Sequence, residues 1–426
     1  MKVMKFGGTS VGTAEAMRLV AGAITKQSGN MIVVLSASSG VTDKLVNITN
    51  SLPEDITSAR SIYIEVEAQM LKIASDLELS ESSIIKVTAL LHELSQLIYS
   101  VELLEFISDN VANRIVAYGE LLSTTIFSEY FSNSYSCKFL NITDYLTYDK
   151  KADQYTLANK EEIGRLLFSH NTIVTQGFIC KNTDGNISNL GRGGSDYSAA
   201  IIAAEMQAKE LQIWTDVNGV MSADPRIIKN PLTKNRINVG SLERMAFFGA
   251  KVIHPDTLKP TLMANIPVKI LNTFNSDNHG TLVTIDRDNP IPTFTIKRKC
   301  LLYTFRTSSK KNLYQVNKYV TNMIIKKSLN LLSSVHIDNA VHYVLERSID
   351  KFLDSDMNYE SKKIDLIYIC ELNNSKINAI LTNLNNLNIQ HLEVDWASGA
   401  ILILANADNK TEDYDRFHDM LINVVD

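Results

Sequence analysis

The residues of this chain that could do chemistry gather at two junctions where an apolar run gives way to a helical pattern. At the first junction, the segment Lys-Phe-Gly-Gly-Thr-Ser occupies residues 5–10. Glycines let backbone N–H groups approach an anion closely, and the positive end of a following helix favours that anion. Lys5 adds a mobile positive charge, and we expect Thr9 or Ser10 to cap the helix. The segment predicts a phosphate site, although an ordinary capped turn uses the same residue types.

The second junction holds the segment Gly-Arg-Gly-Gly-Ser-Asp at residues 191–196. Arg192 carries a planar guanidinium that matches a carboxylate, and we expect Ser195 or Asp196 to cap the next helix. Asp196 stands where a dinucleotide-binding fingerprint has its third glycine, which argues against a dinucleotide-dependent dehydrogenase. The junction predicts a second anion site, and the alternative is a tight turn with a surface arginine.

Two further segments are weaker evidence for a ligand site. An apolar run ends at Trp-Thr-Asp-Val, residues 214–217, and a turn follows at Asp-Pro-Arg, residues 224–226. Ligands of open α/β sheets bind outside the carboxyl ends of the strands. Arg226 and Lys251 would add positive charge there, although each alone is typical of a solvated surface. The segment Tyr-Gly-Glu at 118–120 is weaker still.

The elements that must position these residues follow from hydrophobic spacing. Continuous apolar runs predict buried strands at 31–35, 172–175, 211–215 and 268–272. Residues 36–40 turn out of the first of these strands and could form a ligand edge. Apolar residues recur at helical spacing between 61 and 105 and at 197–207. The alternation predicts an α/β fold with a mostly parallel central sheet that helices cover on both faces.

Length and composition narrow the class of protein. At 426 residues the chain exceeds a single typical core. Its formal net charge of −5, without a long basic run, argues against nucleic acid or a membrane surface as a partner. The four cysteines lie far apart, which argues against a zinc site or a disulfide framework. No stretch has the apolar length of a membrane span, so we expect a cytoplasmic protein.

A polar segment with two prolines at 286–292 is the best domain boundary. We therefore expect one large domain over 1–285 and, over 293–426, two small α+β modules, because strand and helix patterns recur there twice.

Taken together, seven motifs in this order resemble those of aspartokinase. They are Lys-Phe-Gly-Gly-Thr-Ser-Val at 5–11, Ser-Gly-Val-Thr at 39–42, Tyr-Gly-Glu at 118–120, Gly-Arg-Gly-Gly-Ser-Asp at 191–196, Trp-Thr-Asp-Val at 214–217, Asp-Pro-Arg at 224–226 and Gly-Ala-Lys-Val-Ile-His-Pro at 249–255. The resemblance spans residues 1–285 and implies the amino-acid-kinase fold. The tail at 293–426 is similar, less closely, to the paired ACT regulatory modules of that family.

The resemblance implies ATP-dependent phosphorylation of the side-chain carboxylate of L-aspartate to 4-phospho-L-aspartate, which opens lysine, diaminopimelate, threonine and methionine synthesis. It assigns catalysis to Lys5, Arg192, Asp196 and Lys251. It assigns aspartate binding to Thr42, Glu120, Arg192, Gly193, Gly194 and Ser195. It assigns ATP binding to Lys5, Phe6, Gly7, Gly8, Thr215, Asp216, Met221, Arg226, Lys251 and Val252.

This chemistry suits these residue types. A substrate carboxylate with a pKa near 3.9 is deprotonated at neutral pH, so no general base is needed. Two anions must meet in line, and a clamp of lysine and arginine with Mg²⁺ lowers their repulsion. We expect the phosphates and water to hold Mg²⁺, because the sequence shows no dedicated protein metal site.

The chain departs from the family pattern at several positions. Met221 stands where the family usually has a tyrosine, and Lys311-Asn312 stands where a Gly-Phe pair normally starts the first ACT helix. Ser334 replaces an aspartate used for effector binding. An amino-acid effector, lysine first among the candidates, and a homodimer through the ACT-like region are what the resemblance implies.

Two alternatives stay open at this point. One is another amino-acid-kinase relative that acts on glutamate, acetylglutamate, carbamate or a nucleotide. The other, from a different class, is an amino-acid sensor whose kinase site no longer turns over.

Overall fold

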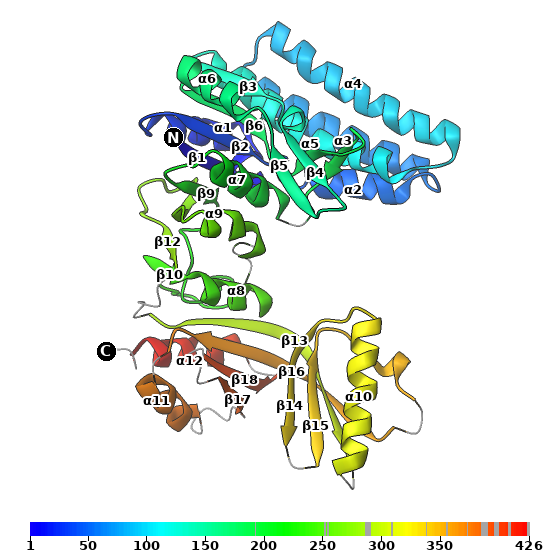
Figure 1. Cartoon of the computed structure of the whole chain (residues 1–426), viewed down its shortest axis with the longest axis vertical. Coiled ribbons are helices and arrows are strands. Elements are labelled where there is room, and N and C mark those ends of the chain that lie inside the picture. The colour runs from blue at the N-terminus through cyan, green and yellow to red at the C-terminus, as the bar shows by residue number, and fades with distance from the viewer. Residues whose placement is uncertain are drawn as a thin grey trace. The chain divides into compact units, whose positions relative to one another are not determined.

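The computed structural model describes residues 1–191, 193–250, 253, 255–285, 291–307, 310–337, 339–354, 357–372, 374–384, 391–395, 400–407 and 410–423. The chain forms two compact units (Figure 1). The first unit comprises Met1–Val220 and Ile253–Thr284, and the second comprises Met221–Val252 and Ile285–Asp426. Among the described helices, none is long and apolar enough to cross a membrane. The predicted domain boundary near residue 285 stays a prediction. The second unit also includes residues 221–252, which precede that boundary in the sequence.

The first unit is built on a mostly parallel sheet with the strand order β12-β11-β9-β1-β2-β6-β3. The strands are β1 (Lys2–Phe6), β2 (Met31–Leu35), β3 (Cys137–Leu140), β6 (Thr172–Gln176), β9 (Leu211–Thr215), β11 (Val268–Asn272) and β12 (Thr281–Thr284). Only the pair β11 and β12 is antiparallel among the described pairs of these strands. All four strands expected from continuous apolar runs are confirmed, because a strand buried on both faces has no polar alternation.

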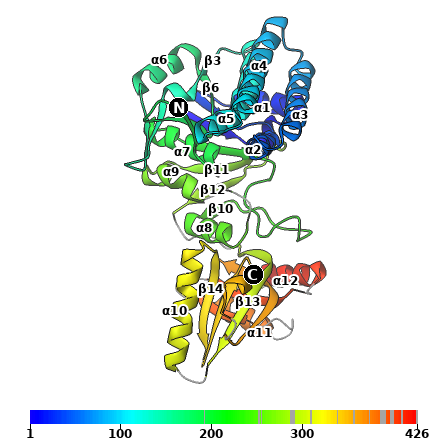
Figure 2. The same ribbon diagram turned by 90° about the vertical axis from the view of Figure 1, so that its right-hand side faces the viewer.

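Helices cover both faces of this sheet, as the sequence predicts. One side carries α1 (Ala14–Thr25), α2 (Val41–Ser51), α3 (Ile56–Asp76), α4 (Glu81–Leu104) and α5 (Asp109–Ser132). The other side carries α6 (Lys160–His170), α7 (Gly194–Glu205) and α9 (Lys259–Met263), as Figure 2 shows. The helical spacing at 61–105 corresponds to α3 and α4, which are capped by the side chains of Asp55 and Ser80.

A small second sheet in the first unit was not predicted. Its strand order is β5-β4-β7-β8, with β4 (Leu146–Asp149), β5 (Gln154–Leu157), β7 (Ile179–Asn182) and β8 (Ile187–Asn189). These strands are short and largely half-buried or exposed, so their sequences lack the apolar runs of the central strands.

The second unit is an antiparallel sheet with the order β14-β15-β13-β16-β18-β17. Its strands are β13 (Thr293–Arg306), β14 (Leu331–Ile337), β15 (Ala340–Leu345), β16 (Tyr359–Cys370), β17 (His391–Asp395) and β18 (Ala400–Asn406). Its helices are α10 (Lys310–Lys326), α11 (Asn374–Leu384) and α12 (Thr411–Asn423), and the same unit holds β10 (Arg236–Asn238) and α8 (Val239–Phe247).

The two predicted α+β modules share their longest strands. β13 and β16 pair antiparallel from Thr293 to Phe305, with a shift in register between Lys297 and Cys300. One half of this ladder packs with α11 and α12, and the other half packs with α10. The two modules therefore form one continuous sheet.

Candidate functional site

A cavity of about 630 Å³ lies in the first unit, where β1, β2, β6 and β9 end and the turns that follow them begin. It is the position at which open α/β sheets bind ligands. The residues that line it are Lys5, Gly7, Gly8, Thr9, Ser36, Ala37, Ser38, Ser39, Gly40, Thr42, Asp43, Glu120, Phe178, Gly191, Gly193, Gly194, Ser195, Asp196, Thr215 and Asp216.

The glycine turn after β1 packs tightly on the turn after β2. A β-carbon at Gly8 would lie 2.9 Å from the carbonyl oxygen of Ala37, and the Ser39 N–H donates to the Gly8 carbonyl at 3.0 Å. A side chain at residue 8 would therefore force the two turns apart. The first prediction for this turn is wrong in one detail. Neither Thr9 nor Ser10 caps α1, because residues 8–11 form a 3-10 helix and Thr13 accepts from the Ala16 N–H instead.

Lys5 and Phe6 show how strand alternation selects the site residues. Successive side chains of β1 point to opposite faces of the sheet. Phe6 is fully buried and its ring stacks on that of Trp214, 5.5 Å away between centroids, so it lies in the core and does not line the cavity. Lys5 faces the cavity, where its Nζ lies 2.8 Å from Oδ1 of Asp196.

Glu120 projects from α5 into the same cavity and is only 2% exposed. Its Oε1 accepts the Ala37 N–H at 3.1 Å, while Oε2 has no hydrogen-bond partner among the described residues. Burial raises the pKa of this carboxyl to about 8, although the Ala37 N–H and the charge of Lys5 act to lower it. A buried acceptor without a partner is costly, so the site favours a ligand that brings a cationic donor.

The start of α7 forms another wall of the cavity. Gly193, at φ +73°, is the residue before the helix, and no side chain caps it, so the expected capping by Ser195 or Asp196 is wrong. Ser195 instead lies against the turn after β6, where a β-carbon at Gly177 would come within 2.7 Å of its Cβ. The Gly194 N–H donates to the Gly191 carbonyl at 2.9 Å, so an anion at this positive end of α7 would meet the later amides of the first turn.

The other predicted residues fall into three groups. Thr42, Thr215 and Asp216 line the cavity with Gly7, Gly8, Gly193 and Gly194. Arg192, Lys251 and Val252 lie outside the described residues. Met221 and Arg226 belong to the second unit, where Arg226 pairs with Asp224 at 2.5 Å.

Thr9, Asp43 and Phe178 also line the cavity but were not assigned to the site. Asp43 directly follows the motif at 39–42 and lies in the first turn of α2, which is the signal that could have found it. Phe178 carries no motif; it lies here because the Phe178 N–H donates to Ser198 of α7 at 2.9 Å.

The charges of the cavity are unevenly divided among the lining residues that the structure describes. Lys5 is the cation, and Asp43, Glu120, Asp196 and Asp216 are the acids. Within the described part of the chain, no group of three or more His, Cys, Asp or Glu side chains could hold a metal ion.

Comparison with known proteins places these features in a family. The model of the amino acid kinase family matches residues 1–272. The aspartokinase of Chlamydia trachomatis is 35% identical over 295 residues, which cover 66% of this chain and 64% of that protein. The lysine-sensitive aspartokinase 3 of Escherichia coli is 31% identical over 300 residues, which cover 68% of this chain and 65% of that protein. The chain thus spans less than two thirds of the length of these curated relatives.

One solved structure extends the likeness over both units. Escherichia coli aspartokinase III, in complex with lysine and aspartate, is 25% identical to this chain, with a TM-score of 0.78, and the match covers 99% of each chain.

Proposed function

Because the chain belongs to the amino acid kinase family, we propose that it is an aspartate kinase, which transfers the γ-phosphate of ATP to the side-chain carboxylate of L-aspartate and forms 4-phospho-L-aspartate. The observation that carries the proposal is the Glu120 carboxyl, buried in a cavity that also holds Lys5 and a helix N-terminus. A substrate with one ammonium and two carboxylates matches that combination, and the named aspartokinases among its relatives support it.

In this proposal Glu120 receives the α-ammonium of aspartate. An ionised Oε2 gains a charge-assisted hydrogen bond there, which replaces the partner it otherwise lacks. Gly193, Gly194 and Ser195, at the start of α7, and Thr42, in the first turn of α2, line the cavity where this proposal puts a substrate carboxylate. The proposal also assigns that carboxylate to Arg192.

The phosphates belong to the glycine turn in the same proposal. Gly7 and Gly8 line the cavity where this proposal puts the phosphates, and Lys5 would neutralise charge as the two anions approach. Asp196 holds the Lys5 ammonium in place at 2.8 Å and is a positioning residue rather than a base. If Mg²⁺ is bound with ATP, the phosphates and water would hold most of it, and it would supply positive charge that lowers the repulsion between the anions. The proposal assigns the remaining contacts with the nucleotide to Thr215, Asp216, Met221, Arg226, Lys251 and Val252.

The second unit is the regulatory part in this proposal. Lysine is the first effector to test, since a relative is described as lysine-sensitive. A homodimer would form through the ACT-like region, where β14 and β17 are the outermost strands of the described sheet. The four cysteines are free thiols, in agreement with a cytoplasmic location.

The test is a hydroxamate assay with aspartate, ATP, Mg²⁺ and hydroxylamine. We expect aspartyl hydroxamate from the native chain and a loss of kcat of about 10²–10³ in Lys5→Met, the scale of losing one preorganised transition-state contact. The matched control is Lys2→Met on the same strand, because Lys2 contacts Gln27 and not the cavity. Glutamate, acetylglutamate, carbamate and UMP run alongside, and the absence of aspartyl hydroxamate above the Lys5→Met level rejects the proposal.

A further inference from the structure

Ser10 is a residue of the glycine motif to which the proposed function gives no role. It is fully buried and does not line the cavity. It does not cap α1 either, because residues 8–11 form a 3-10 helix. Its hydroxyl instead forms a hydrogen bond of 2.7 Å with the hydroxyl of Thr273, which lies 263 positions away in the sequence. A buried bond between such distant segments fixes where the glycine turn lies.

On one side, the 3-10 helix of the glycine turn is tied to the turn after β2. The Ser39 N–H donates to the Gly8 carbonyl at 3.0 Å. The Ser38 hydroxyl donates to the Val11 carbonyl at 2.7 Å. The turn after β2 also donates a backbone N–H to the Glu120 carboxyl. This side of the glycine turn is therefore joined to the part of the cavity that the proposed function gives to aspartate.

On the other side of the glycine turn lies the cavity edge formed by Thr215 and Asp216, at the end of β9. β9 runs parallel to β11 and pairs with it as far as Thr215 and Asn272. One residue further on, the Thr273 N–H donates to the Thr215 carbonyl at 2.9 Å. The backbone of Thr273 thus holds the cavity edge, while its side chain holds Ser10.

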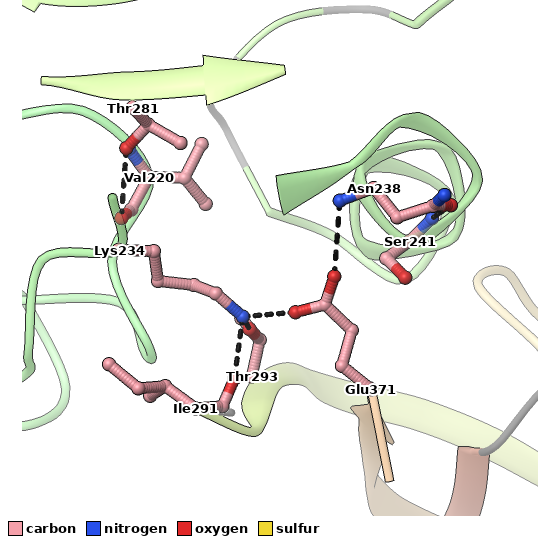
Figure 3. Close-up of polar contacts among 8 residues, drawn as sticks. All are labelled: Val220, Lys234, Asn238, Ser241, Thr281, Ile291, Thr293 and Glu371. Carbon is pink, nitrogen blue, oxygen red and sulfur yellow. Dashed lines mark hydrogen bonds and ion pairs between the residues drawn. The ribbon is translucent and has the colours of Figure 1, made fainter. Parts of the chain in front are cut away.

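The chain that follows β9 is fixed to β11 and β12 at two more points, all of them within the first unit. The side-chain amide of Asn272 donates to the Asn218 side chain at 2.7 Å. The Val220 N–H donates to the Thr281 hydroxyl at 2.8 Å, as Figure 3 shows. Residues 215–220 therefore keep a fixed place relative to the ends of these strands.

The strand ladder does not extend to the phosphate side of the glycine turn. The Gly7 N–H donates to the Trp214 carbonyl at 3.1 Å, which continues the pairing of β1 with β9 by one residue. Beyond it, within the described part of the chain, the hydroxyl pair is the hydrogen bond that joins residues 8–11 to β9 and β11. Without this pair the turn would stay attached to the β2 side alone.

We propose that the Ser10–Thr273 hydroxyl pair is a positioning contact for nucleotide binding. It holds the glycine turn, where the proposed function puts the phosphates, at a fixed distance from Thr215 and Asp216. A nucleotide that contacts both places needs that distance to be set. The positions assigned to aspartate lie on α2, α5 and the start of α7 and depend on it less. The inference rests on the proposed function and adds to it two residues that touch neither substrate.

The kinetic test uses the double variant Ser10→Ala with Thr273→Val. It removes both hydroxyls at nearly constant shape, so neither is left buried without a partner and the chain is expected to fold. We expect its KM for ATP to rise about tenfold, equivalent to about 1.4 kcal/mol, while its KM for aspartate changes less than twofold. A folded double variant with the native KM for ATP, or with both KM values raised equally, overturns the proposal.

Two single variants separate the hydroxyl of Thr273 from its packing. Thr273→Ser keeps the hydroxyl and loses a methyl group, whereas Thr273→Val keeps the shape and loses the hydroxyl. We expect Thr273→Ser to retain the native KM for ATP within twofold and Thr273→Val to raise it. The reverse order would show that the methyl group matters and would overturn the proposal.

The matched control is Thr175→Val, which removes another buried hydroxyl of the same sheet. The Thr175 hydroxyl donates to the Leu140 carbonyl at 2.8 Å, and Thr175 does not line the cavity. The control should leave both KM values unchanged. If it raises the KM for ATP as much as the double variant does, the loss of any buried hydroxyl has this effect and the proposal fails.

A second measurement separates this inference from the proposed function. Calorimetry of ADP binding to the full-length native chain, the double variant and the control needs no aspartate. We expect the Kd for ADP to rise about tenfold in the double variant alone. If the native chain binds ADP but forms no aspartyl hydroxamate, and the double variant binds ADP more weakly, the proposed function fails and the positioning contact stands. Equal affinity for ADP removes the positioning contact whatever the activity, and a native chain that does not bind ADP overturns both.

Discussion

At the scale of single residues, burial of the Glu120 carboxyl costs stability at any pH at which the carboxyl is ionised. Its pKa lies near 8 in the folded chain because burial disfavours the charged form, and the unfolded chain has the ordinary value of 4.5. The folded state thus holds the proton more tightly than the unfolded state. Its contribution to stability is fully present below pH 4.5 and is lost as the pH rises through 8.

Glu120→Gln tests this at constant shape. At pH 5 we expect the variant and the native chain, both without ligands, to unfold within about 1 kcal/mol of each other. At pH 9 the variant should be the more stable by a few kcal/mol, since the amide has no charge to desolvate. Thermal unfolding at the two pH values measures the difference in stability between the variant and the native chain. If that difference is the same at pH 5 and at pH 9, the ionised carboxyl does not destabilise the folded chain and the prediction fails.

At the scale of elements, the start of α7 is placed by its contact with the turn after β6. A β-carbon at Gly177 would lie 2.7 Å from Cβ and 2.8 Å from Cα of Ser195, so the helix must move to admit it. We expect Gly177→Ala to cost about 1–3 kcal/mol of stability and to raise the KM for aspartate more than the KM for ATP.

Gly164→Ala is the matched control for this change, because Gly164 is an exposed residue within α6 and nothing lies within 4 Å of the added carbon. It should stabilise the chain by about 0.5–1 kcal/mol. Denaturant unfolding of the two variants gives the comparison, and a stabilising Gly177→Ala would show that α7 is not fixed there.

The elements also show which signals a sequence carries. The strand at 31–35 and its three counterparts were predictable, since they are buried on both faces and continuously apolar. Cys137–Leu140 was not, because this edge strand has polar and half-exposed positions. The cap of α1 was misassigned because Thr9, Ser10 and Thr13 are all suitable residue types. Thr9 and Ser10 lie in a 3-10 helix, so α1 begins later and Thr13 is its cap. Motifs contain cavity-lining residues such as Lys5 and Glu120, but they do not contain Phe178. That Phe6 does not line the cavity follows from the face of the sheet to which each β1 side chain points.

At the scale of the whole molecule, neither compact unit is a single continuous stretch of the sequence, because each is built from two separate segments. A boundary after residue 285 looks natural from composition, yet it would separate Ala223 and Ile228 from the cluster that buries them. Long-range contacts between 221–252 and the tail leave no local pattern in either segment, which is why the sequence did not indicate them.

A fragment of residues 1–284 should therefore expose the segment. We expect trypsin to cut it at Lys229, Lys234 or Arg236 much faster than it cuts the full chain, where the Lys234 side chain is fully buried. Mass spectrometry of a digestion time course identifies the sites, and cleavage at Lys72 in α3 serves as the internal control. Equal resistance of 221–252 in both proteins would show that the segment folds without the tail.

The shared strands of the second unit have a consequence for how such a protein can change over generations. Modules joined by a linker can be exchanged by recombination, since a crossover in the linker leaves each hydrophobic core whole. Here β13 and β16 each pass through both cores. A crossover that replaced one of the two modules would divide two strands in half, so the pair is inherited as a single piece.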